Sequence, residues 1–212
     1  MYKYKAVLFD LDGTLLNTSF DLADALNFAL AKHGYKTFST DDVVKMVGHG
    51  ITNLIKTATN ESDDVVNKVR IDFKNYYKEH LCDKTRPYDG IIDLLKDLKA
   101  NGVYTAVVSN KYNQATKKLS DTFFGSLIDY AIGEDNCPTK PDPYMANTVI
   151  NYFNVDKKDC VFVGDADTDI NTAKNTGIDC ITVSWGFKSR DYLSSNGAKV
   201  IVDTVTELKN KL

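Results

Sequence analysis

Residues 9–15 of the chain have the sequence FDLDGTL, in which an apolar run gives way to two aspartates, Asp10 and Asp12. The run itself, residues 5–10 (KAVLFD), is short and rich in aliphatic side chains, which is typical of a buried parallel strand. Asp10 and Asp12 are therefore expected at the carboxyl end of that strand, followed by Gly13 and Thr14. Ligands of open α/β sheets bind at this end of the strands, although the same residues could also form a plain turn.

Five further apolar runs predict the other strands of the sheet. They lie at residues 104–110, 127–133, 160–165, 180–185 and 199–203. Helical patterns separate most of them, and these begin or end at residues suited to helix termini, namely Gly102, Pro143 and Gly177. The alternation of strands and helices predicts an α/β fold with a doubly wound parallel sheet.

One segment, residues 17–86, interrupts this alternation. Four helical patterns occupy residues 20–34, 39–47, 51–59 and 62–81, and no strand is predicted among them. In the last pattern Phe73 and Tyr76 belong to the apolar face. We therefore expect an all-helical cap at residues 17–86, inserted into a core made of residues 1–16 and 87–212.

The composition is that of a folded globular protein. Of the 212 residues, 43% are apolar and 26% are charged, and the formal net charge is −3. These values exclude a disordered chain and leave no basic footprint for nucleic acid. No apolar stretch approaches the roughly 18–20 residues of a membrane span, and the N-terminal run is too short for a signal peptide. The four cysteines form no metal-binding pattern and are expected to be free thiols. We expect a cytoplasmic monomer or homodimer with neither nucleic acid nor a membrane as a partner.

Polar side chains gather at the ends of the predicted strands. Ser109 and Asn110 end the second strand, and Lys140 precedes the helix before the fourth. Asp165 and Asp169 come at the end of the fourth strand, in VGDADTDI. Several acidic side chains at one edge would repel one another unless they hold a hard cation, and carboxylates suit Mg²⁺. Because Mg²⁺ commonly bridges to substrate phosphate, the pattern points to phosphoryl chemistry.

The segment DADTDI also matches the opening of a calcium EF-hand loop. Such a loop has glycine at its sixth position and glutamate at its twelfth, but here these residues are Ile170 and Thr176. A predicted strand, not a helix, precedes the segment. The EF-hand interpretation is therefore excluded, and Asp167 is expected in solvent or at a helix start, outside the site.

The order of these motifs resembles that of the haloacid dehalogenase superfamily. The matching features are DxDGT at residues 10–14, Ser109 after a strand, Lys140, and GDxxxD at residues 164–169. The resemblance covers essentially the whole chain and implies a Rossmann-like core with the small helical cap of the superfamily's phosphatases. Within the superfamily, the segments RPYDGIIDLLKDLKANG, VSNK, KPDPY and VSWGFKSRDYL look most similar to phosphoglycolate phosphatases.

The resemblance implies a covalent mechanism with Mg²⁺ as the cofactor. Asp10 would attack phosphorus to give an aspartyl-phosphate, and Asp12 would act as acid and then as base. The metal-site residues that it implies are Asp10, Asp12 through its backbone carbonyl, Asp165 and, behind these ligands, Asp169.

Substrate binding is implied for a further set of residues. In the core these are Thr14, Ser109, Asn110 and Lys140. Ser109 and Lys140 would also be catalytic, because they would hold and neutralise the transferring phosphoryl group. In the cap, the turn GHGITN would bring Gly48, His49 and Gly50 toward the leaving group. The turn lacks the third glycine of a nucleotide-binding loop, and a tight connection between two helices is the alternative.

Together these residues predict a Mg²⁺-dependent phosphatase acting on a small phosphorylated metabolite, with 2-phosphoglycolate as the best match. Pyrophosphatase, nucleotide 5′-phosphatase, and sugar-phosphate phosphatase or mutase activities remain alternatives, because the core recognises only the phosphoryl group. Dehalogenation and phosphonate cleavage are disfavoured by the second aspartate, Asp12. A non-catalytic phosphate-binding or protein-interaction module is the remaining alternative, although the intact set of Asp10, Asp12 and Lys140 argues against it.

Overall fold

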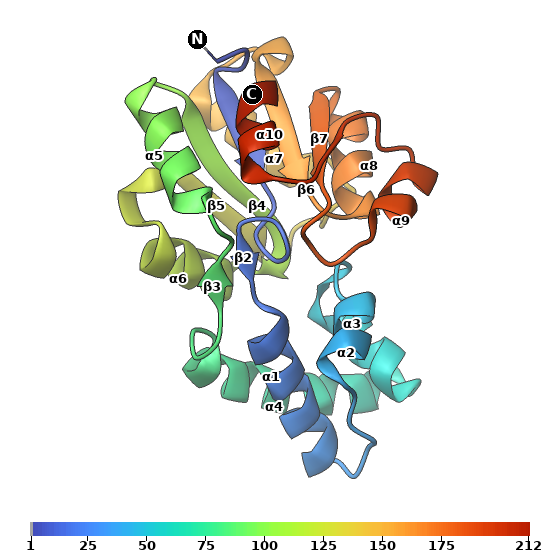
Figure 1. The fold of residues 1–212 in the computed structure, drawn as a ribbon. Helices are drawn as coiled ribbons and strands as arrows, with labels where there is room; N and C mark the ends of the chain where they lie inside the picture. The colour runs from blue at the N-terminus through green and yellow to red at the C-terminus, as the bar shows by residue number, and fades with distance from the viewer. Residues whose placement is uncertain (1) are drawn as a thin grey trace.

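The structure, a computed structural model, describes residues 2–212. A sheet with helices on both faces forms one part of the molecule, and a group of helices from the N-terminal part of the chain forms the other (Figure 1). None of the helices in residues 2–212 is both long enough and apolar enough to cross a bilayer.

The sheet of the core has the strand order β5-β4-β1-β6-β7-β8, and all of its strand pairs are parallel. Its strands are β1 (Ala6–Phe9), β4 (Tyr104–Tyr112), β5 (Tyr130–Glu134), β6 (Cys160–Gly164), β7 (Asp179–Val183) and β8 (Ile201–Val202). The chain builds outward from β1 to β5 and then crosses to β6, so the topological switch point lies beside β1. The predicted doubly wound α/β fold is confirmed.

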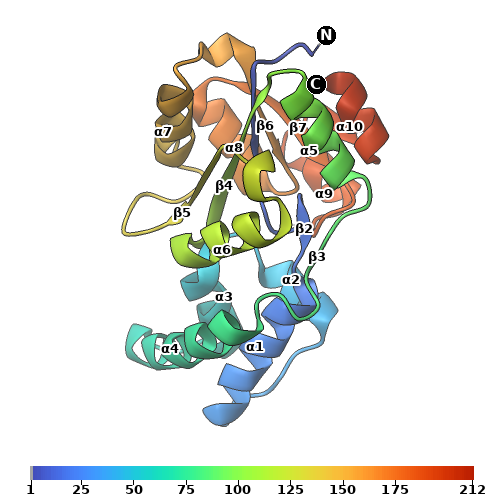
Figure 2. The same cartoon turned by 90° about the vertical axis from the view of Figure 1, so that its left-hand side faces the viewer.

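Helices cover both faces of this sheet. They are α5 (Ile91–Ala100), α6 (Asn113–Phe123), α7 (Tyr144–Phe153), α8 (Asp167–Thr176), α9 (Arg190–Ser195) and α10 (Val205–Lys211), with short 3₁₀ turns at Gly125–Leu127 and Lys157–Asp159. Alternate residues of β1 face opposite sides. Val7 and Phe9 belong to the apolar cluster that includes α5 and α10, whereas Ala6 and Leu8 belong to the one that includes α7. Figure 2 shows α7 and α5 on opposite sides of the sheet.

Four helices make up the cap, as the sequence predicts. They are α1 (Ser19–Lys32), α2 (Thr40–Met46), α3 (Gly50–Thr59) and α4 (Asp63–His80), and α1 and α4 lie side by side in both views (Figures 1 and 2). Within α4, Phe73 is fully buried as expected, and Tyr76 is half-buried, packs against the apolar cluster and stacks on Phe28. Tyr77, which the sequence pattern did not single out, is fully buried as well. The buried residues of α4 follow spacings of three and four along the helix, which keeps them on one face.

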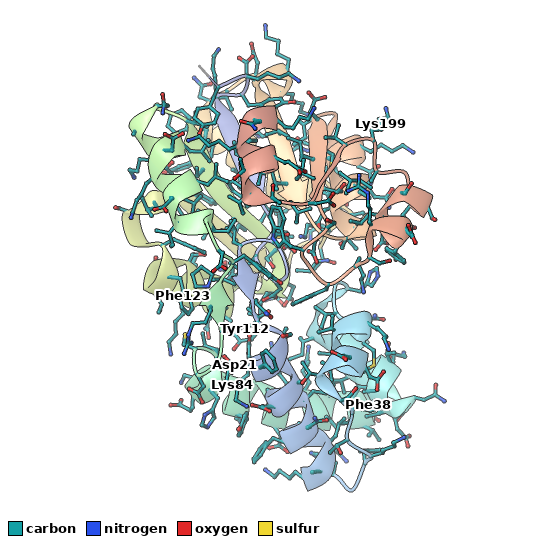
Figure 3. All side chains as sticks on the ribbon, viewed as in Figure 1. Asp21, Phe38, Lys84, Tyr112, Phe123 and Lys199 are labelled. Carbon is teal, nitrogen blue, oxygen red and sulfur yellow. The ribbon has the colours of Figure 1, made fainter. Side chains whose placement is uncertain are left out.

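A short antiparallel ribbon connects the cap to the core. It pairs β2 (Leu16–Asn17) with β3 (Arg86–Pro87), and two residues a strand are too few to leave a sequence pattern. Beside it, the buried carboxylate of Asp21 accepts the backbone N–H groups of Lys84 (3.0 Å) and Thr85 (2.9 Å). Figure 3 shows Asp21 and Lys84 next to each other at this junction. Asn17 and Arg86, the two ends of the proposed cap, are paired with each other in this ribbon. We therefore keep residues 17–86 as the proposed cap.

Candidate active site

One cavity, of about 60 Å³, lies between the carboxyl ends of β1, β4 and β6 and the helices of the cap. The core contributes charged and polar side chains to its lining, and the cap contributes a largely apolar wall. The core side chains include Asp10, Asp12, Ser109, Asn110, Lys111, Lys140, Asp165 and Lys188, and the cap wall consists of Leu22, Val47, Ile51, Leu54, Phe73 and Tyr77. A ligand in this cavity would meet the charges of the core on one side and apolar groups on the other.

Lys140 is the centre of a buried network of charges. Its Nζ lies 2.7 Å from Asp10 Oδ1 and 2.7 Å from Asp169 Oδ1, and its side chain is 2% exposed. Asn110 fixes the loop that carries Lys140: the Asn110 Oδ1 accepts the Lys140 backbone N–H (2.7 Å), and Nδ2 donates to the Lys140 carbonyl (3.0 Å). Asn110, predicted to bind substrate, therefore positions Lys140 against Asp10.

Burial and mutual repulsion change the acidities of these groups. Burial raises the pKa of Asp10 to about 6, against the opposing effect of the Lys140 ammonium. Burial, together with nearby Asp10 and Asp169, raises the pKa of Asp165 well above its usual range. Burial alone would lower the pKa of Lys140, but the two carboxylates beside it outweigh burial and raise it. The carboxylates thus need more positive charge than one lysine supplies.

The residues present fit a divalent cation. Asp10, Asp165 and Asp169 each offer a carboxylate oxygen, and these oxygens all lie within 4.8 Å of one another. Hard cations such as Mg²⁺ favour oxygen ligands of this kind. Asp169 is the least available ligand, because Oδ1 accepts from Lys140 and Oδ2 accepts from the backbone N–H of Ala166 (3.0 Å). Asp10 Oδ2, in contrast, has no hydrogen-bond partner within residues 2–212.

The Asp165 carboxylate is held in place by its surroundings. Its Oδ1 accepts from Thr14 Oγ1 (3.2 Å), and its Oδ2 accepts from the backbone N–H of Phe187 (2.6 Å). Gly13 and Gly186 approach so closely that a Cβ on either would lie 2.3 or 2.4 Å from Asp165 Oδ2. Thr14, predicted to bind substrate, is fully buried and supports Asp165 from outside the cavity lining.

The Asp12 side chain lies apart from this carboxylate cluster. It accepts a hydrogen bond from Thr18 Oγ1 (2.7 Å), and both of its oxygens lie 3.0 Å from Lys111 Nζ. The Asp12 side chain is thus not one of the three carboxylates that lie within 4.8 Å of one another. Lys111 was not predicted as a site residue; the signal was its position directly after Ser109 and Asn110 in a buried strand.

The end of α2 and the loop that follows it contact the core through backbone carbonyls. Asn110 Nδ2 donates to the Gly48 carbonyl (3.1 Å), and Lys188 Nζ donates to the carbonyl of Lys45 (2.9 Å). Gly48 and Gly50 line the cavity, but His49 between them is exposed and does not. Lys188, also missed in the sequence, joins the lining from the loop after β7. Tyr112 also lines the cavity and lies where the core meets the cap (Figure 3).

Comparisons of the sequence and of the structure with known proteins agree on one family. A family model described as haloacid dehalogenase-like hydrolase matches residues 7–183. The chain is 29% identical to phosphoglycolate phosphatase 1 of Pseudomonas aeruginosa, covering 96% of this chain and 78% of that protein. It is 31% identical to phosphoglycolate phosphatase of Colwellia psychrerythraea, covering 96% and 95%. The crystal structure of a putative phosphoglycolate phosphatase from Lactobacillus delbrueckii superposes with a TM-score of 0.92 at 38% identity, covering 99% and 98% of the two chains.

Proposed function

The chain belongs to the family of haloacid dehalogenase-like hydrolases, and on that premise we propose that it hydrolyses a small phosphomonoester through an aspartyl-phosphate on Asp10. One observation carries the proposal. Asp10 lines the cavity with one carboxylate oxygen hydrogen-bonded to Lys140 and the other without a partner among residues 2–212, which is the arrangement a carboxylate nucleophile needs.

The neighbouring side chains have the chemistry for both half-reactions. Asp10 would form a bond to phosphorus while the bond to the ester oxygen breaks, and Asp12, protonated at the start of the cycle, would give that oxygen its proton. Asp12 would then take a proton from the water that attacks the aspartyl-phosphate, which releases inorganic phosphate and restores Asp10. Lys140 and the Ser109 hydroxyl lie at the same edge and would stabilise the charge on the transferring oxygens.

Mg²⁺ is the metal that we propose for the carboxylate cluster. Asp10 and Asp165 would hold it through side chains and Asp12 through its backbone carbonyl, while Asp169 stays bonded to Lys140. A bound divalent cation would supply positive charge at the phosphoryl oxygens and let the anionic nucleophile approach an anionic substrate. The raised pKa values of Asp10 and Asp165 support this proposal, since both carboxylates are under-neutralised without it.

We further propose 2-phosphoglycolate as the substrate. The names of the relatives support it, and so does a cavity small enough to exclude polymers. Pyrophosphate, nucleotide 5′-phosphates and sugar phosphates remain the competing substrates, because the core groups would treat their phosphoryl ends alike. We also propose a reducing, cytoplasmic location, which the four free thiols support. That the protein is a monomer or homodimer stays a prediction.

A hydrolysis panel tests the proposal. Phosphate release from 2-phosphoglycolate, pyrophosphate, a nucleotide monophosphate and glucose 6-phosphate is measured with Mg²⁺ and with EDTA. We expect Asp10→Asn to abolish turnover of every substrate while circular dichroism stays unchanged. Asp167→Asn is the control for the same Asp-to-Asn change, because Asp167 lies in the GDxxxD motif beside Asp165 but outside the carboxylate cluster, and it should retain activity. Substantial phosphate release by Asp10→Asn would refute the mechanism.

A further inference from the structure

Lys111 is a buried lysine that faces the cavity on the side of Asp12. Its side chain is 4% exposed, and within the described part of the chain its Nζ has only Asp12 as a hydrogen-bond acceptor. The remaining side of the ammonium lies over the ring of Tyr77, 4.7 Å from the ring centre. A lysine ammonium has three N–H donors, so an acceptor beyond Asp12 can still be bound.

Tyr77 provides a second, independent observation at the same place. Its side chain from α4 is fully buried and lines the cavity, yet its hydroxyl has no hydrogen-bond partner among residues 2–212. A buried hydroxyl without a partner is costly, and native structures rarely keep one without a use. The Tyr77 hydroxyl thus has an uncommitted donor among the described residues, on a side chain that lines the cavity.

The other cap residues around this corner cannot recognise polar groups through their side chains. Tyr77 is the single polar side chain that the cap contributes to the lining in the described chain, and the remainder of the wall is aliphatic or phenyl. Such a wall lowers the local dielectric constant, which strengthens any interaction between an ammonium and an anion there.

Two other lysines line the cavity, but their ammonium groups are engaged elsewhere. Lys140 is held between Asp10 and Asp169, on the side of the nucleophile. Lys188 donates to a backbone carbonyl of the cap and has no contact with Asp12 in the described residues. Lys111 is thus the cation beside the group that would protonate the leaving oxygen.

We propose that Lys111 and Tyr77 form a subsite for a carboxylate carried by the leaving group, directly beyond the ester oxygen that Asp12 serves. The inference rests on the proposed phosphatase function and deepens it, because it names the feature of the substrate that the enzyme reads. The Lys111 ammonium bridges the Asp12 side chain and the substrate carboxylate, and the Tyr77 hydroxyl donates to the latter. A single compact ammonium suits one carboxylate without demanding a fixed bidentate geometry.

The test compares two substrates that differ only in this group. In 2-hydroxyethyl phosphate a neutral CH₂OH replaces the carboxylate of 2-phosphoglycolate, while the phosphate ester is retained. We expect the wild type to prefer 2-phosphoglycolate in kcat/KM. In Lys111→Met this preference should fall roughly 10- to 100-fold, and in Tyr77→Phe roughly 3- to 10-fold, as expected for losing one charged and one lesser hydrogen bond.

Lys188→Met is the matched control, since it removes a lysine from the same cavity. It should change kcat/KM for the two substrates by the same factor. An equal loss for both substrates in Lys111→Met would overturn the inference and assign Lys111 to Asp12 alone. A selective loss in Lys188→Met, or a wild type without preference, would overturn it as well, while phosphatase activity itself would stand.

A second measurement covers the case in which Lys111→Met does not fold. Glycolate, the product that carries the carboxylate, should inhibit the wild type, and Tyr77→Phe should weaken this inhibition severalfold, whereas ethylene glycol should inhibit neither. Glycolate inhibition that is identical in the two proteins would refute the subsite. If the wild type released no phosphate from either ester, the proposed function would fail and the inference with it.

Discussion

Replacing Lys140 by methionine should expose how strongly the carboxylate cluster depends on one lysine. The Lys140 ammonium is the only cation within hydrogen-bonding distance of Asp10 and Asp169 in the described chain, and both contacts measure 2.7 Å. Methionine keeps much of the aliphatic volume of lysine but removes the charge. Three buried carboxylates within 4.8 Å of one another would then face each other without a counter-charge.

The expected cost follows from this geometry. Removing one partner of a buried ion pair typically destabilises a protein by about 3–5 kcal/mol, because the remaining charge is left uncompensated. Such a loss is a large part of the roughly 5–15 kcal/mol by which a domain is stable. A double-mutant cycle measures the contribution of the Lys140–Asp169 ion pair to this cost. In Lys140→Met with Asp169→Asn, the amide oxygen can still accept from the Ala166 backbone, so the double variant should recover about 1–3 kcal/mol relative to additivity.

Urea unfolding in EDTA measures these free energies for the wild type, the two single variants and the double variant. The same series in excess Mg²⁺ should show a larger stabilisation of Lys140→Met than of the wild type, since the cation then supplies the missing charge. Two results would refute the reasoning. One is a Lys140→Met protein within about 1 kcal/mol of the wild type in EDTA. The other is strict additivity in the double-mutant cycle.

Three further predictions concern the metal site and the cap. Gly186→Ala places a Cβ 2.4 Å from Asp165 and from the Gly13 carbonyl, so calorimetry should find Mg²⁺ affinity lowered about tenfold or more, and unchanged affinity would contradict this. Because the folded-state pKa of Asp10 is raised to about 6, the metal-free protein holds a proton there that the unfolded chain has lost, and stability falls as pH rises from about 4 to 6. The free-energy difference between Asp10→Asn and the wild type in EDTA should therefore shift in favour of Asp10→Asn across that window, and a constant difference would be inconsistent with the shift. Tyr77→Phe removes a buried hydroxyl without a partner, so its unfolding free energy should equal or exceed that of the wild type, and a clear loss would show an overlooked partner.

The parts of the site that the sequence predicts are those created by the parallel sheet. Parallel strands bring their carboxyl ends to one edge, so Asp10, Ser109 and Asp165 could be placed together from three separate segments. The position of Lys140 in the site was predicted from its motif. No sequence pattern could show that the Asn110 side chain hydrogen-bonds the backbone of Lys140.

The parts that the sequence does not predict depend on how the cap meets the core. Lys111 was predicted only as the residue that follows a strand. Its partner Asp12 lies ninety-nine positions away in the sequence, so no local pattern indicated the contact. The helical period placed Tyr76 on the apolar face of α4, where it is half-buried, but it did not show that Tyr77 is fully buried and lines the cavity. The ribbon of β2 and β3 is too short to produce any period.

The way the cap is held would leave its side chains free to set the substrate specificity that we propose for them. Asn110 and Lys188 of the core both donate to backbone carbonyls of the cap, those of Gly48 and Lys45. A backbone carbonyl is present whatever the side chain, so these two contacts impose little on the sequence of the cap loop. The cap side chains that line the cavity are then free to vary with the leaving group. In this chain they are apolar except for Tyr77, and we therefore expect substitutions there to change which ester is hydrolysed, while substitutions at Asp10 or Lys140 stop hydrolysis of all of them.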